Sequence, residues 1–113
     1  MASRRICFSH SHTVEISQFL KRGEKSLELS ITILPTSDGF ITTSFSISEW
    51  SKNIKTVIHT YTVSSSFKTS EYVFKTLDGL MHHYINNGKI DGFTVIQIFN
   101  AHEAQEHMYS RTS

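Results

Sequence analysis

The sequence has little of the chemistry that staples or anchors small proteins. Among its 113 residues Cys7 is the sole cysteine, so no disulfide can form within the chain and a reducing compartment is expected. No apolar stretch approaches the ~18 residues that a membrane span needs. The apolar residues 6–8 are far too few for the core of a signal peptide. We therefore expect a soluble protein of the cytoplasm, or of the nucleus, that does not bind membranes.

An excess of charge of one sign is also lacking. Lys and Arg number 11 against 10 Asp and Glu, a formal net charge of +1, which excludes a strongly basic nucleic-acid tail and an acidic disordered segment. The 5 glycines are scattered and form no phosphate-binding loop, and no Gly-x-Ser-x-Gly elbow occurs. No carboxylate pair shares an apolar strand or helix face. These absences predict that the protein is not an enzyme and uses no cofactor.

Hydroxyl groups are what the chain has in excess, with 17 serines and 12 threonines. Many alternate with apolar residues over residues 27–34, 40–48 and 55–63, and this period of two predicts three half-buried strands. The turn residues 35–39 predict that the first two strands form a hairpin. In this interpretation the hydroxyls lie on outer, solvated faces of a sheet.

The apolar spacing changes to 3.6 residues from about Ser70 to Asn86, which predicts a helix that is capped at Thr69 or Ser70 and ends near Gly88. Residues 93–99 carry apolar groups on both faces and predict another strand. Residues 13–22 fit either a short helix or a strand.

Together these elements predict one α+β domain over residues 1–113. Its mainly antiparallel sheet has about four to six strands, and one principal helix packs on one face. Residues 1–12 and 101–113 are expected to be ragged termini.

Cys7, His10 and His12 are the most suggestive cluster for a metal ion. The two histidines would point to the same side of a strand, and Cys7 would add a third ligand if the chain turned. His59 is the candidate for a fourth ligand if its strand is adjacent. Two histidines that alternate with serines also arise by chance, so no metal is predicted and the question stays open.

Basic residues gather at the start of the chain, where phosphate contacts would need them. Five lie within the first 25 residues: Arg4, Arg5, Lys21, Arg22 and Lys25. If residues 13–22 were helical, the order α-β-β-β-α would resemble a double-stranded-RNA-binding domain. Only Lys68 stands where that family has a Lys-Lys pair. The resemblance implies RNA binding, and RNA or DNA is therefore the alternative partner.

The sequence favours a protein-interaction or assembly module that self-associates through a sheet edge or an aromatic surface. Aromatic residues are enriched at the centres of interfaces. Four are candidates here: Trp50, Phe67, Phe93 and Phe99. Frequent isoleucine with scarce alanine and glycine is common in AT-rich coding sequences, which is compatible with a small viral accessory or regulatory protein. The expected partner is a second copy of the chain or another protein.

Overall fold

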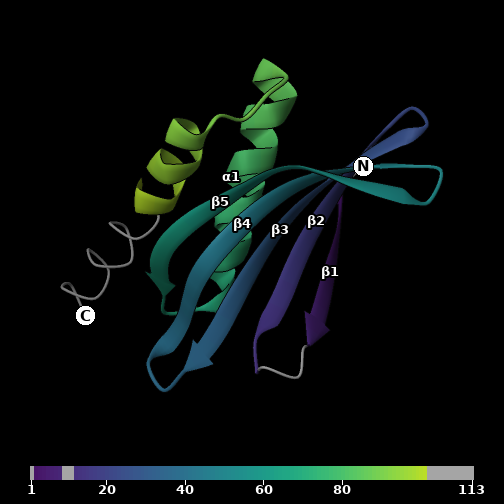
Figure 1. Cartoon of the computed structure of the whole chain (residues 1–113). Coiled ribbons are helices and arrows are strands. Elements are labelled where there is room, and N and C mark those ends of the chain that lie inside the picture. The colour runs from purple at the N-terminus through teal and green to yellow at the C-terminus, as the bar shows by residue number, and fades with distance from the viewer. Residues whose placement is uncertain (1, 9–11, 102–113) are drawn as a thin grey trace. The chain divides into compact units, whose positions relative to one another are not determined.

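The computed structural model describes residues 2–8 and 12–101. Within them lie the strands and the long helix β1 (Ala2–Phe8), β2 (Val14–Arg22), β3 (Lys25–Thr36), β4 (Gly39–Ser51), β5 (Ile54–Phe67) and α1 (Ser70–Asn87). Residues 92–101 are also helical, up to the end of the described chain. The strands follow one another in chain order in a five-stranded antiparallel sheet (Figure 1). The predicted α+β class is confirmed.

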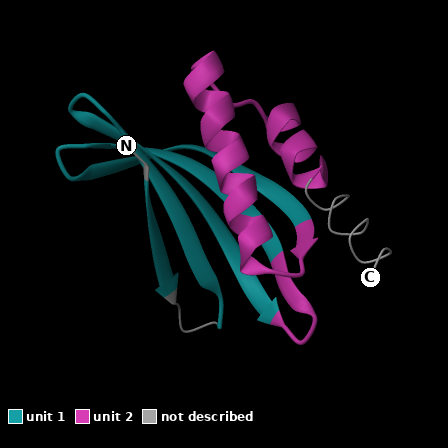
Figure 2. Ribbon diagram, turned by 180° about the vertical axis from the view of Figure 1, so that it is seen from behind, with its two compact units in different colours: residues 1–35, 42–64 teal, residues 36–41, 65–113 magenta. Residues whose placement is uncertain are grey.

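The chain is divided into two compact units (Figure 2). Unit 1 comprises residues 1–35 and 42–64 and holds most of the sheet. Unit 2 comprises residues 36–41 and 65–113 and holds the turn between β3 and β4, the end of β5 and the helices. Because the chain passes from one unit to the other at residues 35, 41 and 64, the units are not two consecutive domains.

Two tight hairpin turns shape unit 1. Arg22 pairs with Lys25 around a two-residue loop in which Gly23 has a φ of 62°. Between β4 and β5, Lys52 and Asn53 have φ angles of 51° and 67°, the left-handed pair of a type I′ turn. Such turns match the twist of the strands they join. They therefore set the register of both hairpins.

The apolar face of β3 is buried, as its alternation predicts. Leu27, Leu29, Ile31 and Ile33 are all buried, and Ile31 lies opposite Ile16 of β2. A cross-strand pair of β-branched residues of this kind is the basic stabilising contact of a sheet. The period of two in residues 27–34 therefore identified both the strand and its buried face.

The prediction of solvated hydroxyl faces is only partly right, because most hydroxyl side chains of β3 and β4 are buried or half-buried, whereas Thr56, Thr60 and Thr62 of β5 are exposed as predicted. Ser30 and Thr42 are buried. The hydroxyls of Ser17 and Ser30 lie 3.3 Å apart on paired residues, and the Thr42 hydroxyl donates to the carbonyl oxygen of Thr32 at 3.0 Å. Because these hydroxyls find hydrogen-bond partners on neighbouring strands, they leave water at little cost.

In unit 2, α1 confirms the predicted helix. Thr69 is its N-cap residue, and Gly88 ends it with a φ of 74°, while the Gly88 N–H donates to the Tyr84 carbonyl at 2.7 Å. The buried side is apolar and includes Val73 and Leu77. Among the described residues no helix is long and apolar enough to cross a membrane.

The strand predicted over residues 93–99 is wrong, because residues 92–101 are helical. The Asp91 carboxylate accepts the N–H of Thr94 at 2.8 Å, which is the hydrogen bond of a helix N-cap. The backbone N–H and the side chain of Thr94 both donate hydrogen bonds to Asp91, and these bonds lower the pKa of Asp91 below its ordinary value. Val95 and Phe99, four residues apart, are buried on one side of the helix. The cap and this spacing decide against the strand.

Two ambiguities near the start of the chain are resolved. Residues 14–22 are β2, so the element order of a double-stranded-RNA-binding domain is not present. Residues 2–8 form β1, paired with β2 from Ala2–Leu20 to Phe8–Val14, and are not a ragged terminus. The prediction for residues 102–113 lies outside the described residues.

Candidate interaction edge

β5 is the last strand in the order of the sheet, so one side of it has no strand neighbour among the described residues (Figure 1). All side chains from residue 54 to 60 are exposed. Three of them are branched and apolar, with exposed fractions of 68% for Ile54, 55% for Val57 and 46% for Ile58. Val57 and Ile58 are adjacent and point to opposite faces of the strand. Apolar groups are therefore exposed on both faces of this edge.

The composition of the same segment favours strand pairing. Of the ten residues 54–63, eight are β-branched or aromatic, and none is glycine or proline. Lys55 is the single Lys, Arg, Asp or Glu among them. A long, apolar edge strand with few charges is a template for pairing with another strand.

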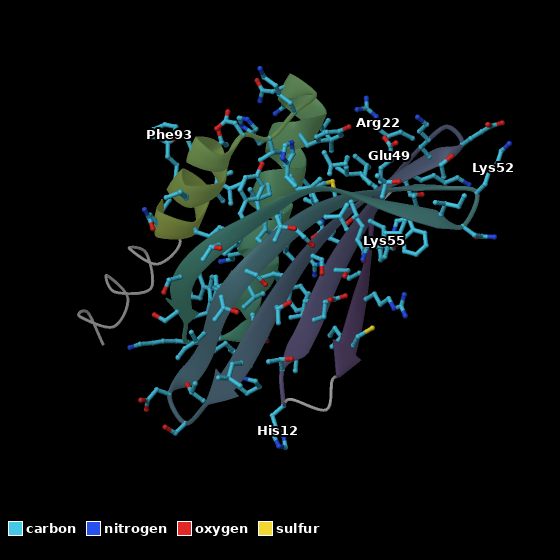
Figure 3. The ribbon with its side chains drawn as sticks, viewed as in Figure 1. His12, Arg22, Glu49, Lys52, Lys55 and Phe93 are labelled. Atoms are coloured by element: carbon cyan, nitrogen blue, oxygen red, sulfur yellow. The ribbon has the colours of Figure 1, made fainter. Side chains whose placement is uncertain are left out.

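A buried carboxylate anchors the start of β5. The Glu28 side chain is only 4% exposed, and its Oε1 accepts the indole N–H of Trp50 at 3.0 Å. The ammonium of Lys55 lies 3.1 Å from the same oxygen and 5.9 Å from the centre of the Trp50 ring. The cluster thus joins β3, β4 and β5; Figure 3 shows Lys52 at the hairpin tip and Lys55 farther back, toward the centre of the sheet.

The anchor keeps Glu28 ionised. Burial alone would raise the pKa of the Glu28 carboxyl. The hydrogen bonds from Trp50, Lys55 and Ser17 and the charge of Lys55 have the larger combined effect, so the pKa lies below its ordinary value. A carboxylate held in this way is a poor general acid, since its proton is lost well below neutral pH. Its effect is structural: it fixes the β4–β5 hairpin and the edge that the hairpin carries.

Farther along β5, aromatic rings hold one face of the strand. The rings of His59 and Tyr61 are stacked with their centres 5.8 Å apart, and Tyr61 stacks on the buried Phe45 of β4 at 6.1 Å. Ring pairs of this kind add to the packing beyond the area they bury. Side-chain contacts therefore join β5 to β4 on both sides of Val57, through Lys55 and Trp50 on one side and through Tyr61 and Phe45 on the other.

β1 is the opposite edge and differs in charge. Ile6 is exposed, but Arg4 and Arg5 are exposed beside it in a strand of only seven residues. Charged side chains on an edge strand discourage pairing with another strand. β5 is therefore the better candidate of the two edges.

The predicted basic cluster is divided by the strand register. Arg4 and Arg5 are adjacent on β1, and Lys21 and Arg22 are adjacent on β2, so each pair points to both faces of the sheet. Arg4 lies opposite Gln18, four residues from Arg22, which is about 13 Å along the strand. No single face carries all of these charges.

The remaining basic residue of that prediction has an acidic neighbour. Lys25 lies opposite Arg22 across the β2–β3 turn, and its ammonium is 3.6 Å from the carboxylate of Glu49 on β4. Figure 3 shows Arg22 and Glu49 in the same region of unit 1. Both side chains of the Lys25 pair are well exposed, so the pair contributes little stability, but it reduces the local positive charge.

The four aromatic residues predicted for an interface are in different surroundings. Phe67 and Phe99 are buried in unit 2, with ring centres 6.1 Å apart in an edge-to-face arrangement. Trp50 is half-buried against Glu28. Phe93 alone is largely exposed, at 71%, and points outward from its helix (Figure 3). Sequence reasoning named these aromatic residues but missed the aliphatic edge of β5.

The residues proposed for a metal ion are not brought together. Cys7 is on β1 and His59 on β5, four strand spacings apart, which is about 19 Å along the sheet. His12 lies in the connection between β1 and β2 with a φ of 61° (Figure 3), and His10 lies outside the described residues. No three His, Cys, Asp or Glu side chains form a metal-binding group in the described ranges.

Unit 2 contains a shallow pocket of about 360 Å³. It is lined by Thr36, Asp38, Phe40, Ile41, Ser66, Phe67 and Lys68. The hydroxyl oxygen of Thr36 accepts the N–H of Asp38 at 3.3 Å, so part of its polar lining is used in the turn itself. The volume lies at the lower end of small-molecule sites, and the lining offers no nucleophile paired with a base.

Comparisons with known proteins give no further guide to function. No protein-family model matches the chain, and neither a curated protein nor a solved structure matches it.

Proposed function

We propose that this protein is a non-enzymatic protein-interaction module that binds a partner by main-chain pairing along the outer edge of β5. The observation that carries the proposal is the exposed stretch Ile54–Thr60 on an edge strand, with three exposed apolar side chains. In such pairing the N–H and C=O groups of the edge supply affinity, and alternate side chains supply specificity. The expected partner is a strand of a protein.

The anchoring of β5 supports this proposal. An edge that binds a strand loses less conformational entropy when it is rigid beforehand. The carboxylate of Glu28 at one end and the stacked ring of Tyr61 toward the other hold the exposed stretch in an extended conformation. The edge is therefore ready to accept a strand without reorganisation.

The alternative of RNA or DNA binding has weaker support. Binding to phosphates needs basic side chains on one surface, and the register divides the predicted cluster between two faces. We therefore propose protein binding in preference to nucleic-acid binding.

A selection of extended peptides displayed on phage tests the proposal. Nonapeptides selected on the immobilised protein are expected to bind the double variant Val57→Lys with Ile58→Lys about tenfold more weakly, because two apolar cross-strand contacts are lost and two charges are gained. The matched control is Ile6→Lys on the other edge strand, where the exposed fraction of 51% is close to that of Val57.

Hydrogen exchange locates the bound peptide. Binding is expected to slow exchange of the amides in residues 54–60. Peptides that bind the double variant as tightly as the wild type, or that leave exchange in this segment unchanged, would show that β5 is not the binding edge.

A further inference from the structure

The exposed stretch of β5 is complementary to a second copy of itself. Along an antiparallel ladder, hydrogen-bonded and non-hydrogen-bonded residue pairs alternate. Two identical strands related by a two-fold axis must therefore have one residue opposite itself, at the axis. Val57 is the middle residue of the exposed stretch Ile54–Thr60, so an axis at Val57 pairs each residue of this stretch with an exposed residue of the same stretch in the other copy.

The pairs in this register are favourable. Val57 lies opposite Val57, while each Thr56 meets an Ile58 and each Ile54 meets a Thr60. All of these residues are β-branched, the type that packs best across strands. Because Val57 and Ile58 point to opposite faces, apolar groups are covered on both faces of the joined sheet.

Charge is compatible with the same register. Lys55 lies opposite His59, and Lys52 of the turn lies opposite Thr62, so no lysine of one copy faces a lysine of the other. The ammonium of Lys55 is also held 3.1 Å from Glu28 of its own chain. Like charges directly opposite each other would destabilise the pair, and this arrangement avoids them.

The other edge does not have this complementarity. Arg5 is the middle residue of β1 (Ala2–Phe8), so the two-fold pairing that uses the whole strand sets Arg5 opposite Arg5. A shift of the axis by one residue toward the N-terminus sets Arg4 opposite Arg4 instead. Both of these registers bring like charges together.

We infer that the strand bound by β5 is β5 of a second copy of this chain, paired antiparallel about a two-fold axis at Val57. The inference rests on the proposed function and names its partner. Pairing joins two five-stranded sheets into one continuous sheet in a symmetric dimer.

A charge exchange at the axis tests the register. Val57→Lys and Val57→Glu are each expected to weaken the dimer at least tenfold in sedimentation, because like charges then lie directly opposite each other. An equimolar mixture of the two variants is expected to restore association as a heterodimer. The matched control is the pair Thr60→Lys and Thr60→Glu, whose mixture should associate no better than either variant alone, since Thr60 faces Ile54 and lies about 20 Å along the ladder from the Thr60 of the other copy.

Disulfide exchange gives an independent measurement. In a Cys7→Ser background under a glutathione buffer, Val57→Cys is expected to link to its own copy. Thr56→Cys and Ile58→Cys are each expected to stay unlinked alone and to link when mixed. Ile6→Cys, on the other edge, is expected to stay unlinked.

The outcomes separate the inference from the proposed function. Rescue or self-linking at another residue of β5 overturns the axis at Val57, and linking at Ile6 overturns the choice of edge. A chain that sediments as a monomer at the highest soluble concentration overturns the second copy as partner. In that last case, selected peptides that still depend on Val57 and Ile58 would uphold strand binding, and peptides that do not would overturn both.

Discussion

Replacing Glu28 with glutamine tests whether the buried carboxylate anchors the β4–β5 hairpin. Glutamine has nearly the same shape and keeps an oxygen for the indole N–H of Trp50, but it removes the charge that faces Lys55 at 3.1 Å. A hydrogen bond to a charged group contributes about 1.5–3 kcal/mol. The Lys55 side chain is 36% exposed and stays partly hydrated, so we expect a loss of about 1–2 kcal/mol in the free energy of unfolding.

The anchor also contains its own reporter. Trp50 is the single tryptophan of the chain and donates directly to Glu28, so its fluorescence during urea unfolding reports on this region. For a domain of this size the expected loss lowers the urea midpoint by roughly 1 M. The matched control is Glu71→Gln, which removes the same charge from an exposed i,i+4 pair with Lys75 and should cost less than about 0.5 kcal/mol.

The pH dependence provides the decisive comparison. The pKa of Glu28 is lower in the folded chain than its ordinary value of 4.5, so the folded state binds this proton less tightly than the unfolded state. The stabilisation is therefore complete above pH 4.5 and is lost as the pH falls through the folded-state pKa. The difference between wild type and Glu28→Gln should shrink as the pH falls below 4.5. A variant as stable as the wild type at pH 7, or a difference that does not change on acidification, would refute the reasoning.

Three further predictions concern unit 2 and the nucleic-acid alternative. Gly39→Ala should lower the free energy of unfolding by about 2–4 kcal/mol, because Gly39 has a φ of 141° and a new Cβ would collide with the carbonyl oxygen of Phe67. At Gly23 a new Cβ meets no atom, so Gly23→Ala should lower it by only about 1–2 kcal/mol, and urea unfolding measures both. Phe99→Ala should cost about 3–5 kcal/mol and the exposed Phe93→Ala less than about 0.5 kcal/mol in the same assay. The wild type should not retard double-stranded RNA at about 50 mM salt, and a clear shift in that gel would return the basic residues to consideration.

The sequence predicted the elements whose apolar residues have one clear period. The alternation in residues 27–34 and the helical spacing after Ser70 each have a single interpretation, and β3 and α1 were found where these patterns predicted them. Five of the seven residues 93–99 are apolar, and they would lie on both faces of a strand, so the apolar spacing does not decide between strand and helix. The hydrogen bond from the Thr94 N–H to Asp91 caps a helix and decides for the helix, whereas the Asp91-Gly92 pair in the sequence was interpreted as a turn.

Burial of some of the hydroxyl side chains was beyond a pattern argument. Alternation identifies the apolar face of a strand, but it does not show whether the polar face meets water or is covered as well. Ser30 and Thr42 are buried because neighbouring strands supply their hydrogen-bond partners, which is a property of the assembled sheet. The candidate site was missed for the same kind of reason: residues 55–63 were predicted as a strand, but strand order, which places β5 at the edge, is not encoded in the period of one segment.

The difference between the two edges determines how large an assembly can become. A sheet with two open edges adds copies without limit, whereas a sheet with one open edge forms a dimer and stops. Arg4 and Arg5 are the charges that close the β1 edge. Replacing both with threonine, which suits a strand and carries no charge, should convert the proposed dimer into larger assemblies whose size increases with concentration in light scattering.

The matched control replaces the charges at the β2–β3 turn, Lys21→Thr with Arg22→Thr, which removes the same net charge without touching an edge strand. If loss of net charge alone drove association, both variants would grow equally. If the edge charges limit association, only the variant of Arg4 and Arg5 will form larger assemblies. Adding Val57→Lys to that variant will then reduce the size of the assemblies. A double variant at Arg4 and Arg5 that stays dimeric at every concentration would contradict the argument that charge closes this edge.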